Sequence, residues 1–301
     1  MSERPAAPTG ARIEGTADGR PMNDPALAPH AARGCVLLHL SDPHFGTEQP
    51  PVVEALVRWV RAQAADAVLV SGDITQRATR AQFMAARDFF QRLGAARLLV
   101  IPGNHDIPLF DLGTRLISPY RRYRAALGDE LEPVLDLPHS LVLGAKTTRR
   151  WRHSDGQIDA AQIERIARRL AAAAPGQLRV VMVHQPVAVT RPEDHENLLH
   201  GREAALARWA EAGVDLVLGG HIHLPFAVRL PEARGAWAVQ AGTAVSSRIR
   251  SGAPNSVNLL RWAAPDGDTR RRCTLERWDF DARRTAFALA RTDTLELPAN
   301  G

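Results

Sequence analysis

Five short polar segments of the sequence carry side chains that can bind metal ions and move protons. In chain order they are Asp42-Pro43-His44, Gly72-Asp73, Gly103-Asn104-His105-Asp106, His184 and Gly220-His221-Ile222-His223. Imidazole nitrogens, carboxylate oxygens and an Asn carbonyl together suit borderline divalent or trivalent first-row metals. The soft thiolates that a structural zinc site would use are not among them. These residue types therefore predict a metal centre that is not a structural zinc site.

The spacing within two of these segments can bring side chains to one side of the chain. Asp42 and His44, like His221 and His223, are separated by a single residue. If the backbone there is extended, residues two apart point the same way. Glycines stand beside the candidate ligands and permit tight turns or a close approach of the backbone. They are Gly72, Gly103 and Gly220.

Each polar segment follows a short apolar run with the length of a β-strand. These runs lie at residues 36–40, 67–70, 97–101, 178–183 and 214–218. Stretches with apolar residues at helical spacing separate them, at residues 51–64, 79–93, 159–173 and 202–212. This alternation predicts βαβ units whose strands are buried on both faces. Because sites in open α/β folds lie beyond the carboxyl ends of the strands, we expect the five segments to meet at one edge of the sheet.

The rest of the sequence follows this alternation less closely. Residues 107–135 form a long irregular stretch, and loops 107–125 and 187–200 are expected to shape a pocket at the metal centre. The last eighty residues contain shorter β-like segments, which predict a second, more antiparallel sheet. These segments lie at residues 226–230, 236–240, 255–262, 272–280 and 284–289.

The division of the chain into parts also follows from its composition. No convincing linker is found after residue 34, so we expect a single domain over residues 34–301. Residues 1–33 are rich in Ala, Pro, Gly and Arg, and they are predicted to be a mostly disordered lead-in.

The overall composition is typical of a soluble globular protein, with 45% hydrophobic and 24% charged residues in a chain of 301. There is no apolar run long enough for a transmembrane helix and no signal-type apolar region, so no membrane insertion is expected. Cys35 and Cys273 are the two cysteines of the chain and cannot form a disulfide framework. This favours a reducing compartment and predicts a cytoplasmic protein.

The net charge of +5 comes from an excess of arginine over acidic residues. Because the arginines are scattered rather than clustered in runs, a nucleic-acid partner is not expected. Solvated helix faces are the first interpretation of these arginines. A broad field that attracts anionic substrates is the alternative.

Taken together, the motifs D-x-H, G-D, G-N-H-D, H and G-H-x-H resemble those of the calcineurin-like metallophosphoesterase superfamily. They span residues 42 to 223 in the order typical of that superfamily. One of them alone is a weak signal, since G-D and D-x-H are common, whereas five in order at predicted strand ends are specific. The resemblance implies an α/β fold, a four-layer αββα sandwich with mixed sheets and a dimetal site at the C-terminal ends of the strands.

The resemblance also implies a role for each motif residue. Two divalent or trivalent metal ions are expected as cofactors, with manganese, iron and zinc as the main candidates. One ion would be bound by Asp42, His44 and His223. The other would be bound by Asn104, His184 and His221, with Asp73 as the bridge between the two ions.

Two further motif residues, His105 and Asp106, would serve catalysis without binding a metal. His105 would contact a phosphoryl oxygen or protonate the leaving group, and Asp106 would orient His105. A hydroxide that bridges the two ions would attack phosphorus in line. The function that the resemblance implies is therefore two-metal-dependent hydrolysis of a phosphoester.

The details of the motifs favour one branch of the superfamily. Protein Ser/Thr phosphatases carry G-D-x-x-D-R-G and G-N-H-E, whereas this chain has Gly72-Asp73-Ile74-Thr75-Gln76-Arg77-Ala78 and G-N-H-D. The segment from Gly242 to Arg248, followed by residues 254–258, resembles the bacterial class III cyclic-nucleotide phosphodiesterase-like enzymes. Pro43 departs from the Leu that many of these enzymes have. The resemblance implies a phosphodiesterase for a small substrate, either a cyclic nucleotide or a generic phosphodiester, and a homodimer, because members of the branch commonly form dimers.

Two alternatives stay open. The first is a nuclease or a lipid-linked pyrophosphatase on the same scaffold, and an apolar surface that faces a membrane would favour the lipid version. The second is a non-catalytic metal-binding scaffold. The roles of Arg77, His195 and His200 are left between substrate contacts and ordinary packing or ion pairs.

Overall fold

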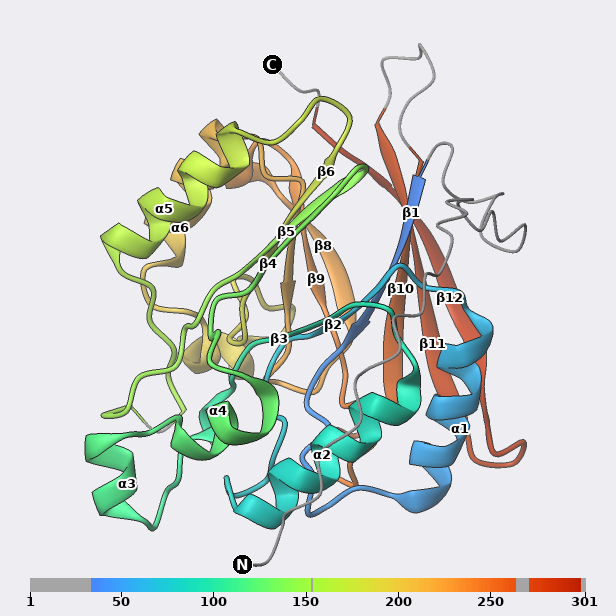
Figure 1. The fold of residues 1–301 in the computed structure, drawn as a ribbon. Helices are drawn as coiled ribbons and strands as arrows, with labels where there is room; N and C mark the ends of the chain where they lie inside the picture. The colour runs from blue at the N-terminus through green and yellow to red at the C-terminus, as the bar shows by residue number, and fades with distance from the viewer. Residues whose placement is uncertain (1–33, 153, 264–270, 299–301) are drawn as a thin grey trace, which may run out of the picture. The chain divides into compact units, whose positions relative to one another are not determined.

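The computed structural model describes residues 34–152, 154–263 and 271–298, so the lead-in predicted at residues 1–33 lies outside the described residues. The described chain forms two six-stranded sheets with helices on their outer faces (Figure 1). None of the helices in these ranges has the length and apolar composition needed to span a bilayer.

The first sheet has the strand order β12-β11-β10-β1-β2-β3. Its parallel half consists of β1 (Gly34–Leu40), β2 (Ala67–Val70) and β3 (Leu98–Val100). Its antiparallel half consists of β10 (Ser256–Ala263), β11 (Arg272–Asp281) and β12 (Ala286–Glu296). The helices α1 (Pro50–Ala62) and α2 (Arg80–Leu93) connect β1 to β2 and β2 to β3, as the alternation predicted.

The second sheet has the strand order β4-β5-β6-β7-β9-β8. Its parallel strands are β5 (Ser140–Gly144), β6 (Leu178–Met182), β7 (Leu216–Gly219) and β9 (Ala236–Gln240). Its antiparallel edge strands are β4 (Val134–Leu137) and β8 (Phe226–Leu230). The helices α5 (Ala160–Ala171) and α6 (Arg202–Glu211) precede β6 and β7. Short 3-10 helices lie at Asn104–Asp106 (η2), Pro192–Asn197 (η3) and Pro231–Ala233 (η4).

Hydrogen bonds of side chains explain where α2 and α5 begin, and a glycine explains where α2 ends. At the start of α2, Thr79 and Gln82 each accept a hydrogen bond from the backbone N–H of the other, which forms a capping box. Asp159 and Gln162 do the same at the start of α5. The helix α2 ends at Gly94, whose φ of 68° lies in the left-handed region that glycine adopts without a Cβ penalty.

Apolar side chains fill three layers of the described structure. Between the sheets, residues such as Leu37 and Val180 have no exposed surface. The helices α1 and α2 cover the other face of the first sheet through residues such as Leu56, and α5 and α6 cover the second through residues such as Trp209. The order helix, sheet, sheet, helix (Figure 1) confirms the predicted four-layer αββα sandwich with mixed sheets.

The placement of the C-terminal strands differs from the prediction of a separate antiparallel sheet. Strands β8 and β9 extend the second sheet, while β10 to β12 extend the first. Strand β10 pairs with β1 from Gly34 opposite Ala263 to His39 opposite Asn258. Without this pairing β1 would be an exposed edge, and an unpaired edge is a template for aggregation.

The stretch predicted to be irregular also contains regular structure. The helices α3 (Leu112–Ile117) and α4 (Arg121–Leu127) lie within it, and β4 begins near its end. Both helices are short, and the residues of β4 alternate between exposed and half-buried positions. Elements of this kind carry little of the apolar periodicity by which sequence patterns are recognised.

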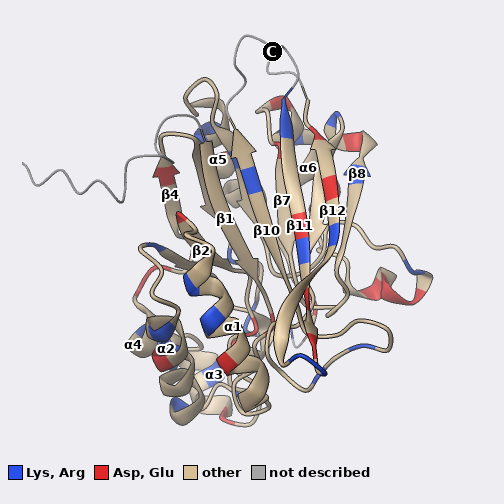
Figure 2. Cartoon of the chain, turned by 90° about the vertical axis from the view of Figure 1, so that its right-hand side faces the viewer, with Lys and Arg blue, Asp and Glu red and all other residues tan. Residues whose placement is uncertain are grey.

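The solvent-exposed parts of β10 to β12 carry interleaved acidic and basic residues (Figure 2). Ion pairs join several of them, as between Arg261 Nε and Glu276 Oε1 at 2.8 Å and between Arg291 Nε and Asp293 Oδ2 at 2.7 Å. The charge on this part of the surface is therefore largely balanced.

A buried ion pair ties the start of β11 to the second sheet. Arg271 Nη1 lies 2.5 Å from Asp215 Oδ1, and Arg271 Nη2 lies 2.8 Å from Asp215 Oδ2. Arg271 also donates to the carbonyl oxygens of Gln177 and Pro298. One guanidinium thus joins the beginnings of β6, β7 and β11 to the C-terminal end of the described chain.

Replacing Arg271 by Ala is expected to lower the free energy of unfolding by about 3–5 kcal/mol, because Asp215 would remain buried without its partner. Urea denaturation followed by circular dichroism measures this loss. Arg272→Ala is the matched control. Arg272 Nη2 lies 3.6 Å from Oε1 of Glu296, and both side chains are exposed. Exposed ion pairs contribute about 0–1 kcal/mol. Equal losses in the two variants would contradict a structural role for the buried pair.

Candidate metal centre

The five polar segments lie where strands end. The segments with Asp42, Asp73 and Asn104 follow β1, β2 and β3 of the first sheet, while those with His184 and His221 follow β6 and β7 of the second. They were expected at one edge of a single sheet. They meet instead at the common end of two sheets that pack face to face, since side chains from both sheets approach within hydrogen-bonding distance there.

The first cluster consists of Asp42, His44 and His223, all buried. The Nε2 atoms of His44 and His223 lie 3.0 Å apart. Asp42 Oδ1 is 3.3 Å from Nε2 of His223 and 3.6 Å from Nε2 of His44. Three potential ligand atoms thus point at one small region.

The second cluster consists of Asp73, His184 and His221, with Asn104 beside them. Nε2 of His184 is 3.3 Å from Asp73 Oδ1 and 3.1 Å from Asn104 Oδ1. The other carboxylate oxygen of Asp73, Oδ2, lies 3.6 Å from Nε2 of His44 in the first cluster. The carboxylate of Asp73 therefore lies between the two clusters.

The proton positions in the clusters fit a bound cation. Nδ1 of His184 lies 2.8 Å from the carbonyl oxygen of Ser71, and Nδ1 of His223 lies 2.6 Å from that of Arg248. A carbonyl can only accept, so each Nδ1 carries a proton and each Nε2 of a neutral ring presents a lone pair to the centre. Asp42 Oδ1 is buried and has no hydrogen-bond partner. Lone pairs and an unsatisfied carboxylate oxygen that converge in this way match the donor set of a first-row metal.

The electrostatics of the clusters also call for positive charge. Burial alone would raise the pKa of Asp73, but the imidazoles of His184 and His105 outweigh it and hold this pKa well below its usual value. Burial alone would lower the pKa of His184, but the charge of Asp73 outweighs it and raises this pKa to about 9. The buried carboxylates therefore stay ionised and attract a positive charge, which a metal ion supplies as well as a proton does.

The backbone at the candidate ligands is left-handed rather than extended. The φ angles are 52° at Asp42, 43° at His44, 50° at Asp73, 73° at His221 and 55° at His223. The condition of an extended chain therefore does not hold. Asp42 and His44 still meet in one cluster, with Oδ1 3.6 Å from Nε2, whereas His221 and His223 belong to different clusters. Such a conformation costs a non-glycine residue about 1–3 kcal/mol, and it persists where the surrounding structure holds it.

Two glycines let these turns approach each other closely, as the sequence indicated. A Cβ on Gly103 would overlap the backbone nitrogen and Oδ1 of Asp73, and one on Gly220 would overlap the side chains of Ser41 and Asp42. A side chain at either position would push two strand ends apart.

The imidazole of His105 borders both clusters. Its ring centroid lies 4.9 Å from that of His44, and its backbone N–H donates to Asp73 Oδ1 at 2.8 Å. Nδ1 of His105 lies 2.9 Å from the carbonyl oxygen of Gln76, so that carbonyl orients the ring.

Asp106 was predicted to orient His105. In the structure its carboxylate forms hydrogen bonds with the loops after β2 and β3. It accepts hydrogen bonds from the backbone N–H groups of Ile74, Thr75 and Gly103 and from the hydroxyl of Thr75. Burial, followed by the charge of Asp73, raises the pKa of Asp106 to about 7, while these donors act against the shift. Asp106 thus joins the loops after β2 and β3, and these loops carry Asp73 and His105.

A residue without a predicted role, Arg248, also lies at the centre. Its Nη1 donates to Oε1 of Gln76 at 2.9 Å and lies 3.3 Å from Nε2 of His105. Its carbonyl accepts from His223, as described above. The sequence singled out the segment from Gly242 to Arg248 for its resemblance to a branch, but arginine is so frequent in this chain that nothing marked Arg248.

The three residues whose roles were left open have different surroundings. Arg77 lies against the ring of Phe110 at 5.6 Å and lines a cavity of about 150 Å³. The other lining residues of this cavity are Gln76, Asn104, His105, Ile107, Leu109 and Phe110. His195 is exposed on η3, and Nε2 of the exposed His200 is 3.8 Å from Asp155. Neither belongs to the metal-ligating groups found in the described residues.

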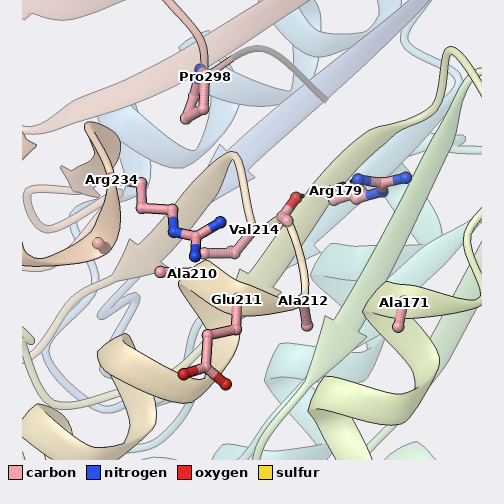
Figure 3. A pocket seen from close by; sticks show the side chains of 10 residues that line it. Ala171, Arg179, Ala210, Glu211, Ala212, Val214, Arg234 and Pro298 are labelled. Carbon is pink, nitrogen blue, oxygen red and sulfur yellow. Dashed lines mark hydrogen bonds between the residues drawn. The ribbon is translucent and has the colours of Figure 1, made fainter. Parts of the chain in front are cut away.

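A larger hollow of about 300 Å³ lies elsewhere (Figure 3). Arg179, Glu211 and Arg234 are among its lining residues, together with Val214. These residues lie toward the amino ends of β6 and β7, whereas the candidate ligands follow the carboxyl ends. None of the candidate metal ligands lines it, so its size alone does not make it the site of the chemistry.

Comparison with known proteins agrees with this geometry. The calcineurin-like phosphoesterase family matches residues 36–225 of the chain. A dimetal phosphatase from Danio rerio has a similar structure, with a TM-score of 0.62 and 13% identity over 88% of this chain and 100% of that one. No curated protein sequence matches the chain.

A second similar structure is purple acid phosphatase PPD1 from yellow lupin (Lupinus luteus) seeds, with a TM-score of 0.65 and 13% identity. The match covers 87% of this chain and 54% of the lupin enzyme, so the chain spans about half of that protein's length. At this identity the two structures show a shared fold.

The close approach at Gly103 can be tested by adding one methyl group. Gly103→Ala is expected to lower the free energy of unfolding by about 1–3 kcal/mol, because the methyl overlaps Asp73 while the φ of −96° is ordinary for alanine. Chemical denaturation of the purified variant measures this. Gly113→Ala in α3 is the control, since its Cβ would meet no atom closer than 3.9 Å. An unchanged stability for Gly103→Ala would mean that the loops can separate freely.

Proposed function

Because this chain belongs to the calcineurin-like phosphoesterase family, we propose that it is a two-metal-dependent phosphoester hydrolase with a preference for diesters. In this proposal the seven clustered residues are the metal ligands, and manganese, iron or zinc occupies the two positions. The observation that carries the proposal is the carboxylate of Asp73, whose two oxygens face histidines of different clusters at 3.3 and 3.6 Å.

Two cations held by these clusters would supply the charge that polarises a phosphoryl group and lowers the pKa of a water molecule toward neutrality. The residues of the chain add binding, orientation and proton transfer. The left-handed turns and the hydrogen bonds of Asp106 hold the ligand side chains in place before a substrate arrives. Such preorganisation is a large part of how enzymes stabilise developing charge.

His105 is the proposed proton donor to the leaving group. Since Nδ1–H of His105 donates a hydrogen bond to the carbonyl oxygen of Gln76, Nε2 is the ring nitrogen that can donate to the leaving group. In the structure Nε2 lies 3.3 Å from the guanidinium of Arg248. A phosphoryl oxygen that binds between the two side chains would accept from Arg248 and release Nε2 for the leaving group.

The cavity next to His105 supports the preference for a diester. A diester carries a second organic group that a monoester lacks, and this group needs room beside the reacting phosphorus. The lining of the cavity combines polar residues, Asn104 and His105, with apolar residues such as Ile107 and Leu109. Together with the resemblance of the segment 242–248 to cyclic-nucleotide phosphodiesterases, this favours a small organic phosphodiester, with cyclic nucleotides as one candidate.

The purified protein with Mn²⁺ is expected to hydrolyse bis(p-nitrophenyl) phosphate. Asp73→Ala should abolish turnover and lower the bound metal below two ions per chain, because the bridging carboxylate is lost. Release of p-nitrophenolate and elemental analysis measure the two effects. His139→Ala, in the turn between β4 and β5 at the opposite end of the second sheet, should leave both unchanged. Two bound ions without turnover of any mono- or diester would refute the proposed enzyme.

His105→Ala and Arg248→Ala are expected to keep both metal ions and lose rate. The loss should be about 10²–10⁴-fold in kcat for His105→Ala, as for a general acid, and about 10²–10³-fold for Arg248→Ala, as for one lost donor to developing charge. Steady-state kinetics with parallel metal analysis separates rate from binding. Arg261→Ala on β10 is the control for the loss of one arginine. Loss of metal in His105→Ala would show that this histidine is a ligand.

A further inference from the structure

An exposed apolar surface lies beside the proposed active site. It consists of six side chains from the loop before α3, from α3 itself and from the segment near residue 150, and we call it the α3 surface. Its members are Leu109, Phe110, Leu112, Leu116, Ile117 and Trp151. Exposure reaches 75% for Phe110 and 85% for Ile117. Large apolar side chains that are exposed together on one segment in this way are typical of a site of interaction.

Specific hydrogen bonds hold the α3 surface together. Arg115, which is buried, donates to the carbonyl oxygens of Pro108 at 3.3 Å and of Arg152 at 2.8 Å. Arg150 Nη1 donates to the carbonyl oxygen of Leu116 at 2.7 Å, and its guanidinium lies 5.5 Å from the ring of Trp151. Trp151 is thereby joined to α3, although the two are far apart in the sequence.

Three exposed arginines near the α3 surface have no acidic partner among the described residues, although Arg122 pairs with Asp111 and Arg152 with Asp155 in the same region. Arg77, Arg121 and Arg150 are exposed, and in the described ranges none of them forms an ion pair with a carboxylate. The exposed parts of β10 to β12 differ, because arginines there are paired with acids (Figure 2). Positive charge in excess thus accompanies the apolar side chains on this face.

We propose that the α3 surface docks the protein on membranes that contain anionic phospholipids. Leucine, isoleucine, phenylalanine and tryptophan side chains enter the boundary between headgroups and acyl chains, and nearby arginines are attracted by anionic lipids. A second copy of this chain is a poorer occupant. A two-fold interface would bring two copies of this positively charged surface together, and the approach of like charges is unfavourable.

The docking surface is continuous with the cavity of the proposed active site. Leu109 and Phe110 belong to both, and His105 lines the same cavity. Docking would therefore bring the opening of this cavity to the level of the lipid headgroups. This consequence rests on the proposed function, and within it adds phosphodiesters carried by a lipid to the candidate substrates.

Co-sedimentation of the full-length protein with vesicles tests the docking directly. Binding is expected to vesicles of phosphatidylcholine mixed with phosphatidylglycerol, with much weaker binding to phosphatidylcholine alone and weaker binding at high salt. The triple variant Leu112→Ser, Leu116→Ser, Ile117→Ser should lower the bound fraction more than about tenfold. The double variant Val134→Ser, Leu289→Ser changes side chains on β4 and β12 that are 50% and 51% exposed, and it should bind like the wild type.

Other outcomes would overturn the docking proposal. These are no binding to either kind of vesicle, equal loss in both variants, or a dimer in solution that the triple variant dissociates. If the triple variant does not fold, Arg121→Glu with Arg150→Glu replaces it and should abolish the preference for anionic vesicles. Vesicle binding needs no turnover, so a protein that binds vesicles but hydrolyses no phosphoester contradicts the proposed function alone.

Discussion

The buried carboxylate of Asp73 is the interaction on which the rest of the site depends. A charge without solvent is costly unless other groups compensate it, and here histidines from two sheets, a backbone N–H and a left-handed turn surround one side chain. The lack of a side chain at Gly103 and the hydrogen bonds of Asp106 follow from the same requirement. Both allow the loop after β3 to press against the loop that carries Asp73.

The strained backbone conformations lie at the candidate ligands, and tightly packed strands precede them. Five of the ligand residues have positive φ angles, whereas the strands that precede them are buried on both faces with almost no exposed surface. Strained turns persist at the ends of such strands because the packed sheets allow the backbone no conformation of lower energy. A centre between two sheets therefore depends on the packing of those sheets, and the buried pair of Arg271 and Asp215 helps to hold one to the other.

The surroundings of the centre are asymmetric. The segment that carries Arg248 brings a guanidinium and a carbonyl oxygen to the histidines. By contrast, the chain after Asp106 forms the short helix α3 with exposed leucines and isoleucine. In the proposed function, the first segment contacts a phosphoryl group and the second an apolar portion of the same molecule.

The sequence by itself determined the alternation of strands and helices up to residue 101 and again over residues 159–218, and the residues that would meet at the strand ends. The four layers followed from the resemblance of the motifs to a known superfamily. Apolar periodicity and short polar motifs are local signals, and they survive without knowledge of the partner strands. Only the tertiary structure decided that β10 to β12 join β1, that a second sheet begins at β4, and that Asp42 and His44 adopt left-handed rather than extended backbone. Strand pairing and strained φ angles depend on contacts between residues far apart in the chain, as with His39 and Asn258. For the same reason Arg248 and the α3 surface became visible only in three dimensions.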